Sequence, residues 1–329
     1  MTYRRWLWPA LILTTLAALV LSVGIGSASI PPARALAALM GHGDPVERAI
    51  LVELRLPRAI LGLAVGAILG LSGAALQGYL RNPLAEPSVL GASNGAALGA
   101  VVAIYFGVAT QHEVALPVLA ILGALVALGV LLLLARRSDS ALTLILAGIA
   151  ISTLTVAGTS LALNLSPNPF AAMEIMTWLL GSLEDRSFRH VALALPCVAI
   201  GALLLAGQGR ALDALTLGED GAAALGIDLS RTRIRLLLGV AIGVGGAVAV
   251  SGAIGFVGLI VPHLIRPLTD RTPSAILWPS ALAGAALLTL ADVAVRVIPT
   301  TNELKLGVVT AFLGVPVFLV HLMRERRLW

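Results

Sequence analysis

The residue types that carry out catalysis or hold metal ions show no catalytic spacing in this sequence. The five histidines are scattered, and neither an HExxH pair nor a paired-cysteine spacing occurs, so no metal site is predicted. The one cysteine, Cys197, lies in an uncharged block and is interpreted as a packing residue. The one lysine, Lys305, does not close a glycine-rich phosphate loop, and no GxSxG nucleophile motif is present. We therefore expect a chain that is not an enzyme and needs no cofactor of its own.

The remaining polar chemistry lies in arginines and hydroxyls that could bind partners or line a path. One of the 22 basic residues is lysine, so 21 are arginine, and they fall at the ends of apolar blocks. A pI near 10.3 would suit a nucleic-acid partner. However, arginines at block ends are typical of membrane topology signals, and no nucleic-acid partner is expected. The longest charged interlude in the second half is TLGEDGAAALGIDLSRTRIR, Thr216–Arg235.

The composition indicates which elements must position these groups. The chain has 329 residues, of which 58% are hydrophobic and only 12% are charged. Soluble domains are about 25% charged, so an integral membrane protein surrounded by lipid is predicted. The alternating strands of a membrane barrel would not leave uncharged blocks of twenty residues and more. The predicted fold class is therefore all-α, with residues 1–329 in a single transmembrane domain.

Uncharged blocks long enough to cross a membrane recur along the chain, since a crossing helix needs about 20 apolar residues. The first block follows two arginines and could also be a signal peptide, but we interpret it as a first span with its N-terminus inside. The blocks are Leu7–Pro32, Ala59–Leu80, Pro87–His112, Val114–Ala135, Ser140–Met173, Val191–Gly209, Leu236–Ile265, Thr272–Ala291 and Leu306–Met323.

Two of these blocks are too long for one helix. Ser140–Met173 carries two prolines in LSPNPF, which predicts a helix end followed by a short helix over Phe170–Gly181. Leu236–Ile265 lies between two arginine clusters, so we predict one full span, a turn at Ser251–Gly255 and a short returning helix. The total is ten membrane helices with both termini inside. Under this topology 14 of the 22 basic residues lie on the inner side.

A repeat indicates a transporter. A shift of 179 residues places VGAILGLSGA, Val65–Ala74, over VGGAVAVSGA, Val244–Ala253. Helices two to five would then correspond, in inverted topology, to helices seven to ten. The middles of the predicted spans carry no charge, whereas ion-coupled carriers usually place an ionisable group there. We therefore favour a transporter powered by another chain, over an ion-coupled carrier and over a structural or channel protein.

Four stretches resemble one family in their order and spacing. They resemble the permease subunits of type II ABC importers for iron-siderophores, haem and cobalamin. Lys305 departs from the family pattern, which commonly has proline there. The four are RLPR (Arg55–Arg58), NPLAEPSVLGASNGA (Asn82–Ala96), GFVGLIVPHLIR (Gly255–Arg266) and ELKLGVVTAFLGVPVF (Glu303–Phe318).

The resemblance implies a homodimer of ten-helix permeases, two cytoplasmic ATPases that bind ATP and Mg²⁺, and one periplasmic substrate-binding protein. The segment at about 212–230 would form the helices that couple to the ATPase; a plain connecting loop is the alternative. Arg55, Arg58 and Arg296 would dock the binding protein, unless they pair within the chain with Glu53, Asp292 or Glu303. The coupling residues are Glu219, Asp220, Gly221, Ala222, Ala223, Leu225 and Gly226.

A gate and a path complete the expected site. The resemblance implies a cytoplasmic gate at Asn82 and Leu84, with Ser140 and Thr143 nearby, although a bland loop role is an equal alternative for the latter two. Hydroxyls and methionines beyond the gate could line a weakly polar path, or each hydroxyl could bond to its own helix backbone. The path candidates are Thr155, Thr159, Ser160, Asn164, Met173, Met176 and Trp178.

The expected function is a permease subunit in the bacterial inner membrane that moves an iron complex, ferric siderophore or haem, from periplasm to cytoplasm. A cobalamin importer of the same family is the alternative, and an ion-coupled secondary transporter is the weaker one. No residue pattern in the chain selects among these substrates.

Overall fold

A computed structural model describes residues 3–26, 28–112, 114–134, 141–166, 168–300 and 303–325, and every regular element in these ranges is a helix. The all-α prediction is confirmed. The longer helices are α1 (Tyr3–Gly24), α4 (Leu56–Leu80), α5 (Ala92–Tyr105), α7 (Ala115–Leu134), α8 (Ala141–Asn164), α9 (Pro169–Leu179), α10 (Phe188–Ala206), α13 (Leu229–Ser251), α15 (Pro273–Val297) and α16 (Leu306–Glu325). The shorter ones are α2 (Pro32–Leu39), α3 (Pro45–Ala49), the π-helix η1 (Ile50–Arg55), α6 (Val108–Gln111), α11 (Gly209–Leu215), α12 (Glu219–Ala224), α14 (Val257–Ile265) and the 3₁₀-helix η3 (Arg266–Leu268).

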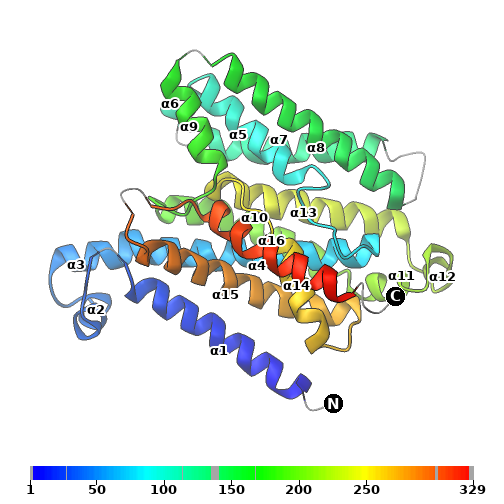
Figure 1. Ribbon diagram of the computed structural model, residues 1–329, viewed down its shortest axis with the longest axis horizontal. Helices are drawn as coiled ribbons and strands as arrows, with labels where there is room; N and C mark the ends of the chain where they lie inside the picture. The colour runs from blue at the N-terminus through cyan, green and yellow to red at the C-terminus, as the bar shows by residue number, and fades with distance from the viewer. Residues whose placement is uncertain are drawn as a thin grey trace.

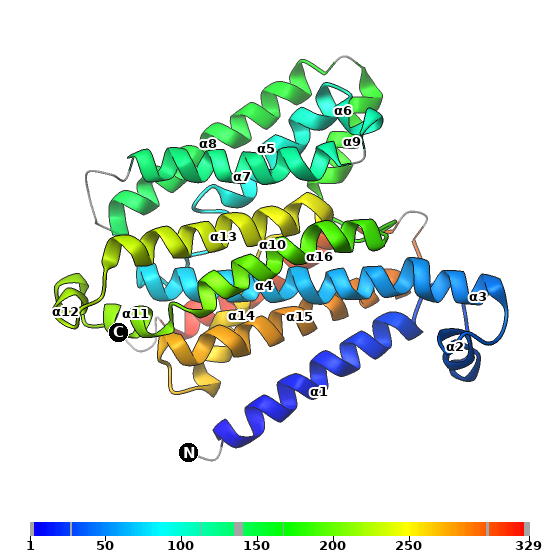
Figure 2. The same ribbon diagram turned by 180° about the vertical axis from the view of Figure 1, so that it is seen from behind.

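The long helices lie roughly side by side in layers (Figure 1). α8 covers one side, followed by α5 with α7, then α10 with α13, then α4 with α15, and finally α1 on the opposite side. The start of α1 and the end of α16 both lie toward the end of the bundle that holds α11 and α12, as both views show (Figure 2). We call this the terminal end, and the end that holds α2, α3, α6 and α9 the distal end.

Seven helices in the described ranges are long and apolar enough to cross a membrane, and three further apolar helices are shorter. The seven include α1, α8 and α10, and one continuous helix, Pro45–Leu80, that joins α3, η1 and α4. The three shorter ones are α5, α14 with η3, and the first part of α16. An α-helical membrane protein follows from these lengths, while the count of ten crossings stays a prediction.

The two predicted breaks are confirmed. α8 ends at Asn164 and α9 follows, with the Asn168 side chain accepting the Ala171 N–H at its start. α13 ends at Ser251, and α14 begins six residues later at Val257. Gly252 has a φ of +69°, which a residue without a Cβ adopts most readily, and this ends α13.

One block forms less helix than its composition suggests. Pro87–His112 contains no charge, yet α5 covers only Ala92–Tyr105. The preceding residues, 81–91, form a loop that ends at Gly91, whose φ is +81°. A residue with this positive φ cannot continue a right-handed helix, so α5 begins only after Gly91.

Close backbone contact joins α4 to α15. A Cβ placed on Gly66 would collide with the Gly284 carbonyl and lie 2.9 Å from the Ala285 Cα. The same collision occurs in reverse, because a Cβ on Gly284 would meet the Gly66 carbonyl. Lipid offers no hydrophobic drive for helix association, so the gain comes from dispersion between closely approaching backbones.

Replacing Gly66 with alanine should force α4 and α15 apart. We expect Gly66→Ala to lower the free energy of unfolding by about 1–3 kcal/mol, as overpacked sites do. Thermal unfolding of the detergent-solubilised protein, followed by size-exclusion recovery, measures this. Gly129→Ala on α7 is the control, because a Cβ there meets nothing within 4 Å. Equal melting temperatures for the two variants would contradict the role of this contact.

Candidate functional site

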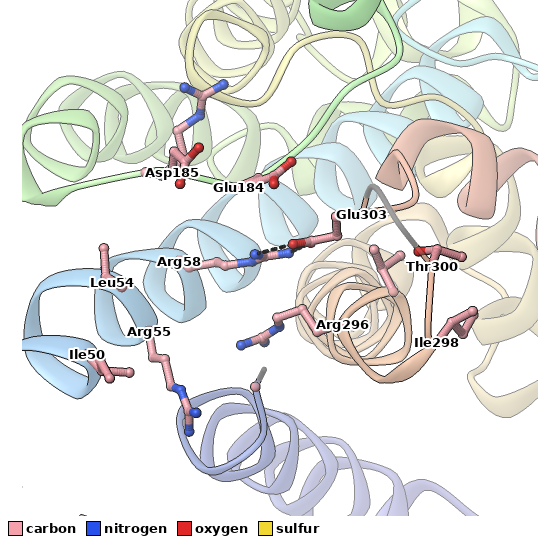
Figure 3. A pocket seen from close by; sticks show the side chains of 13 residues that line it. Ile50, Leu54, Arg55, Arg58, Glu184, Asp185, Arg296, Ile298, Thr300 and Glu303 are labelled. Carbon is pink, nitrogen blue, oxygen red and sulfur yellow. Dashed lines mark hydrogen bonds and ion pairs between the residues drawn. The ribbon is translucent and has the colours of Figure 1, made fainter. Parts of the chain in front are cut away.

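A buried carboxylate organises the charged residues at the distal end. Asp292 on α15 has a side chain that is only 2% exposed, and it pairs with Arg58 on α4 and Arg296 on its own helix. Arg58 Nη2 donates to Asp292 Oδ1 at 2.8 Å, and Arg296 Nη2 lies 3.0 Å from Oδ2. Arg58 also pairs with Glu303, as Figure 3 shows. Two arginines and two carboxylates thus balance one another at the end of the α4–α15 pair.

The same group of arginines holds the end of α1. The last carbonyls of a helix have no partner within it, so they need external donors. Arg296 Nη1 donates to the carbonyls of Ser22 at 2.9 Å and Ile25 at 3.0 Å. Arg55, whose side chain is buried, donates through its guanidinium to the carbonyls of Val23, Gly24 and Ala28.

These contacts bear on the predicted docking residues. Arg58 and Arg296 both pair with Asp292, as the alternative of pairing within the chain predicts. Arg55 binds backbone carbonyls rather than Glu53. All three border a cavity of about 350 Å³ at the distal end (Figure 3). A docking role stays a prediction, and it requires a partner's side chain to enter this cavity.

Arg186, which sequence analysis missed, lines the same cavity from the loop between α9 and α10. Its Nε is buried and has no hydrogen-bond partner within the described part of the chain. Burial lowers the pKa of the Arg186 guanidinium, and the neighbouring Asp185 and Glu184 carboxylates oppose that shift. In the sequence Arg186 stands in the run EDR, which reads as an ordinary solvated loop.

The predicted coupling segment forms two short helices at the terminal end. α12 begins at Glu219 and ends at Ala224, as its acidic start predicts, and Gly226 follows with a φ of +79°. Ala222 is fully buried against the bundle, whereas Ala223 faces solvent and Leu225 is 62% exposed. α12 projects beyond the long helices (Figures 1 and 2).

The segment is also tied to the bundle. Asp213 Oδ1 on α11 accepts the Ser274 backbone N–H at 2.9 Å, in the first turn of α15. A displacement of α11 would therefore be transmitted to a full-length helix that carries Asp292 at its other end.

The predicted gate residues lie on the loop after α4. Asn82 Oδ1 accepts the Leu84 N–H at 2.9 Å, which shapes the loop and leaves the Leu84 side chain 46% exposed. Thr143 lies in the first turn of α8. Ser140 lies outside the described residues.

The predicted path residues fall into two groups, four on α8 and three on α9. Thr155 and Thr159 are buried, and their hydroxyls donate to backbone carbonyls of α8, so the back-bonding alternative describes both. Ser160 and Asn164 also bond to α8 carbonyls but are exposed. The remaining three lie on α9, where Met173 and Met176 are exposed and Trp178 packs against the core.

The loop after α4 carries a further group that the sequence did not single out. The Glu86 carboxylate accepts a hydrogen bond from the Ser88 hydroxyl, and Glu86 lines one cavity together with Phe256. Phe256 stands at the start of α14, about 170 residues further along the chain. The signal present in the sequence was a carboxylate between the two prolines of RNPLAEP.

An all-helical bundle with apolar spans and with charged groups gathered at its ends is an integral membrane protein. Its sequence assigns it more narrowly: residues 13–324 match the model of the FecCD transport family, and the chain belongs to that family.

Relatives of the chain are named as permeases. It is 39% identical over 322 residues to an uncharacterised ABC transporter permease, YvrB, of Bacillus subtilis, covering 94% of this chain and 91% of the relative. It is 40% identical to the cobalamin import system permease BtuC of Halobacterium salinarum, covering 89% and 78%. It is 38% identical to the vitamin B12 import system permease BtuC of Vibrio vulnificus, covering 97% and 95%.

Solved structures share the fold. One, provisionally described as a metal-chelate type ABC transporter in an inward-facing conformation, has a TM-score of 0.85 and 32% identity over 98% of this chain and 99% of that one. PsaBC from Streptococcus pneumoniae, in complex with Fab, has a TM-score of 0.54 at 16% identity, covering 80% and 89%, and supports the fold alone. The protein is thus an ABC importer permease of the FecCD family, and its relatives are transport subunits rather than enzymes.

Removing the charge of Asp292 should leave two buried arginines short of a partner. We expect Asp292→Asn to cost about 3–5 kcal/mol of stability, as breaking a buried ion pair does. Glu47→Gln is the matched control, because Glu47 pairs with Arg34, which is 70% exposed, and should cost about 1 kcal/mol or less. The stabilities of the two variants are compared by measuring their unfolding in a series of mild detergents. If Asp292→Asn were as stable as the control, the cluster would not hold the distal end.

Proposed function

We propose that this chain is the membrane-spanning permease subunit of an ATP-driven importer that moves a corrinoid such as cobalamin from periplasm to cytoplasm across the bacterial inner membrane. The observation that carries the proposal is the 38–40% identity, over most of both chains, to permeases named for cobalamin or vitamin B12 import. This reverses the order expected from the sequence, in which an iron complex came first.

An iron complex, ferric siderophore or haem, is the second candidate. The solved neighbour of the metal-chelate type supports it, because that chain is similar over almost its full length at 32% identity. Both candidate substrates are bulky, and a path with few charged groups suits either one.

The proposed topology has ten crossings in an inverted repeat, with both termini in the cytoplasm. If α4, α5, α7 and α8 correspond in order to α13, α14, α15 and α16, then the α4–α15 contact corresponds to the α13–α7 contact. Both pairs are in extensive contact. The second helix of each set, α5 and α14, is also the short one. The start of α1, the end of α16 and α12 lie toward the same end of the bundle (Figure 1). This shared end supports the proposal that all three lie on the cytoplasmic side.

ABC permeases act with partner chains, and we propose a homodimer with two ATPases and one periplasmic binding protein. Long apolar faces on α8 and α16 support a helix partner: Leu154 is 70% exposed and Phe312 is 77% exposed. Lipid would cover the outer face of α1. ATP and Mg²⁺ would bind on the ATPase, against α11 and α12. An acidic side chain of the binding protein would enter the distal cavity beside Arg58 and Arg296. The transport path would follow α8 and α9. Leu84 would close this path at the terminal end.

A bulky charge on α12 should block the ATPase. Ala223 is exposed on the short helix whose opposite side, Ala222, is buried, so Ala223→Arg changes the contact surface without disturbing the bundle. We expect loss of co-purification with the ATPase and at least a tenfold loss of transport, with unchanged thermal stability. Gln111→Arg adds the same charge to the exposed α6 at the distal end and should retain the ATPase. Retention by Ala223→Arg would contradict the coupling assignment.

Uptake by the complete transporter distinguishes the two substrates. Proteoliposomes that contain the permease, its ATPase and its binding protein should accumulate labelled cyanocobalamin when ATP is supplied inside. Accumulation of a ferric siderophore or haem without cobalamin would assign the second candidate. Accumulation that follows an ion gradient and ignores ATP would contradict the function itself.

A further inference from the structure

Arginines from three segments line one cavity at the terminal end of the bundle, with a volume of about 190 Å³. Arg81 directly follows α4, Arg266 stands in η3, and Arg271 stands between η3 and α15. No carboxylate is among the described residues that line the cavity, so its positive charges have no negative partner there. The other lining residues are Ala74, Gln77, Gly78, Asn82, Pro83, Thr216, Pro273 and Ile276.

The end of α4 builds one wall of this cavity. A Cβ on Gly78 would lie 3.1 Å from the Pro273 Cβ, so α4 lies directly against the start of α15. The Gln77 side chain, which is buried, holds one of the arginines. Its Oε1 accepts from Arg266 Nη2 at 3.1 Å, while its Nε2 donates to the Leu259 carbonyl of α14 at 3.1 Å. A buried amide therefore fixes Arg266 at the cavity.

The other two arginines are not held in this way. Arg81 and Arg271 are exposed, and their guanidinium groups make no hydrogen bond or ion pair within the part of the chain that the structure describes. Arg81 Nη1 lies 4.0 Å from the place of a Cβ on Gly218, at the start of α12. Asp270, which precedes Arg271, lines a different cavity between α1 and α15. Two guanidinium groups thus have donors to offer a ligand.

The same two arginines have an uncommon backbone conformation. φ is +49° at Arg81 and +64° at Arg271, in the left-handed region that glycine adopts most readily. Glycine at either position would be less strained. A long charged side chain at a strained position points to a role for its charge.

The cavity lies where apolar helices end. α4 ends at Leu80 and α14 at Ile265, and α15 begins at Pro273. A neighbouring cavity, which also borders the link between η3 and α15, is lined by Trp8 and Trp278. Tryptophan is enriched at the membrane–water interface, where phospholipid headgroups lie. The arginines are therefore at the depth of the headgroups.

We propose that this cavity binds a phosphate group. Guanidinium groups bind phosphate oxygens through paired N–H donors, and arginines that converge from several segments suit a tetrahedral anion. A phospholipid headgroup and free phosphate share this chemistry, and the depth of the cavity favours the lipid. A phosphate bound there would join the loop after α4, the link between η3 and α15, and Thr216 in the segment that leads to α12.

Thermal unfolding of the full-length chain in a non-ionic detergent tests the site. We expect phosphatidylglycerol to raise the melting temperature, because a ligand that binds the folded state stabilises it. Phosphatidylcholine, whose choline group neutralises the phosphate, should raise it less. Arg81→Gln combined with Arg271→Gln should increase the lipid concentration that gives half of the shift by about tenfold or more. Arg210→Gln is the matched control, because Arg210 is an exposed arginine of α11 outside the cavity, and it should change that concentration by about twofold or less.

A glycine variant separates binding from a role in the fold. Without lipid, Arg81→Gly should melt no lower than the unchanged chain, because glycine adopts a φ of +49° with less strain. It should nevertheless lose most of the response to phosphatidylglycerol. A full lipid response in this variant and in the double variant would overturn the site.

Inorganic phosphate identifies the source of the group. A shift with phosphatidylglycerol but not with inorganic phosphate assigns the lipid headgroup. A shift with inorganic phosphate that the double variant loses assigns the free anion. No shift with either probe overturns the phosphate site. In that case, loss of ATPase co-purification in the double variant but not in Arg210→Gln would assign the cavity to an acidic side chain of the ATPase.

The site goes beyond the proposed function and can fail separately from it. The melting experiments need neither ATPase nor substrate, so an absent lipid response is compatible with ATP-driven uptake. Conversely, absence of ATP-driven uptake leaves the melting comparison intact.

Discussion

The contact between α4 and α15 sets the position of the other functional parts. Their backbones approach at Gly66 and Gly284, where no side chain separates them. That approach brings Arg58 of one helix to Asp292 of the other, and Arg296 can then bind both this carboxylate and the end of α1. Without water in the hydrocarbon region, polar groups must find such partners inside the protein. The cluster is therefore a structural requirement of the fold.

The same helix pair links the two ends of the molecule. The start of α15 is held to α11 through Asp213, and α11 leads into α12, where an ATPase would bind. The other end of α15 carries Asp292 at the distal cavity. A rigid helix fixed at both ends can transmit a small displacement from one end of the molecule to the other. The helices α5 and α14 are shorter, and residues at the start of each line one cavity of about 130 Å³.

Local patterns predicted much of this architecture. The prolines of LSPNPF and the glycines of SGAIG marked the two breaks correctly, because both residue types act on the backbone of their own segment. Charge was a weaker guide to helix ends. α13 begins at Leu229, before its three arginines, and α15 continues through Asp292 and Arg296. A charged residue with an internal partner, or at the membrane surface, does not end a helix.

Depth and long-range pairing could not be predicted from one sequence. Glu86 stands in a segment that reads as a surface loop, yet the chain folds back so that Glu86 lines one cavity with Phe256 and Gly258 at the start of α14. The middles of the predicted spans carry no charge, but a charged residue from a loop still lines a cavity between helices. A partly buried carboxylate is also what a proton-coupled carrier could use, and only family membership favours ATP as the energy source.

The most direct test of the central claim is to purify the tagged chain from membranes of the organism that produces it and to identify what remains bound. The account predicts a Walker-motif ATPase in equal amount to the permease, with ATP turnover that rises when the substrate-loaded binding protein is added. A chain that purifies without an ATPase, and that moves its substrate in response to a proton or sodium gradient, would contradict it.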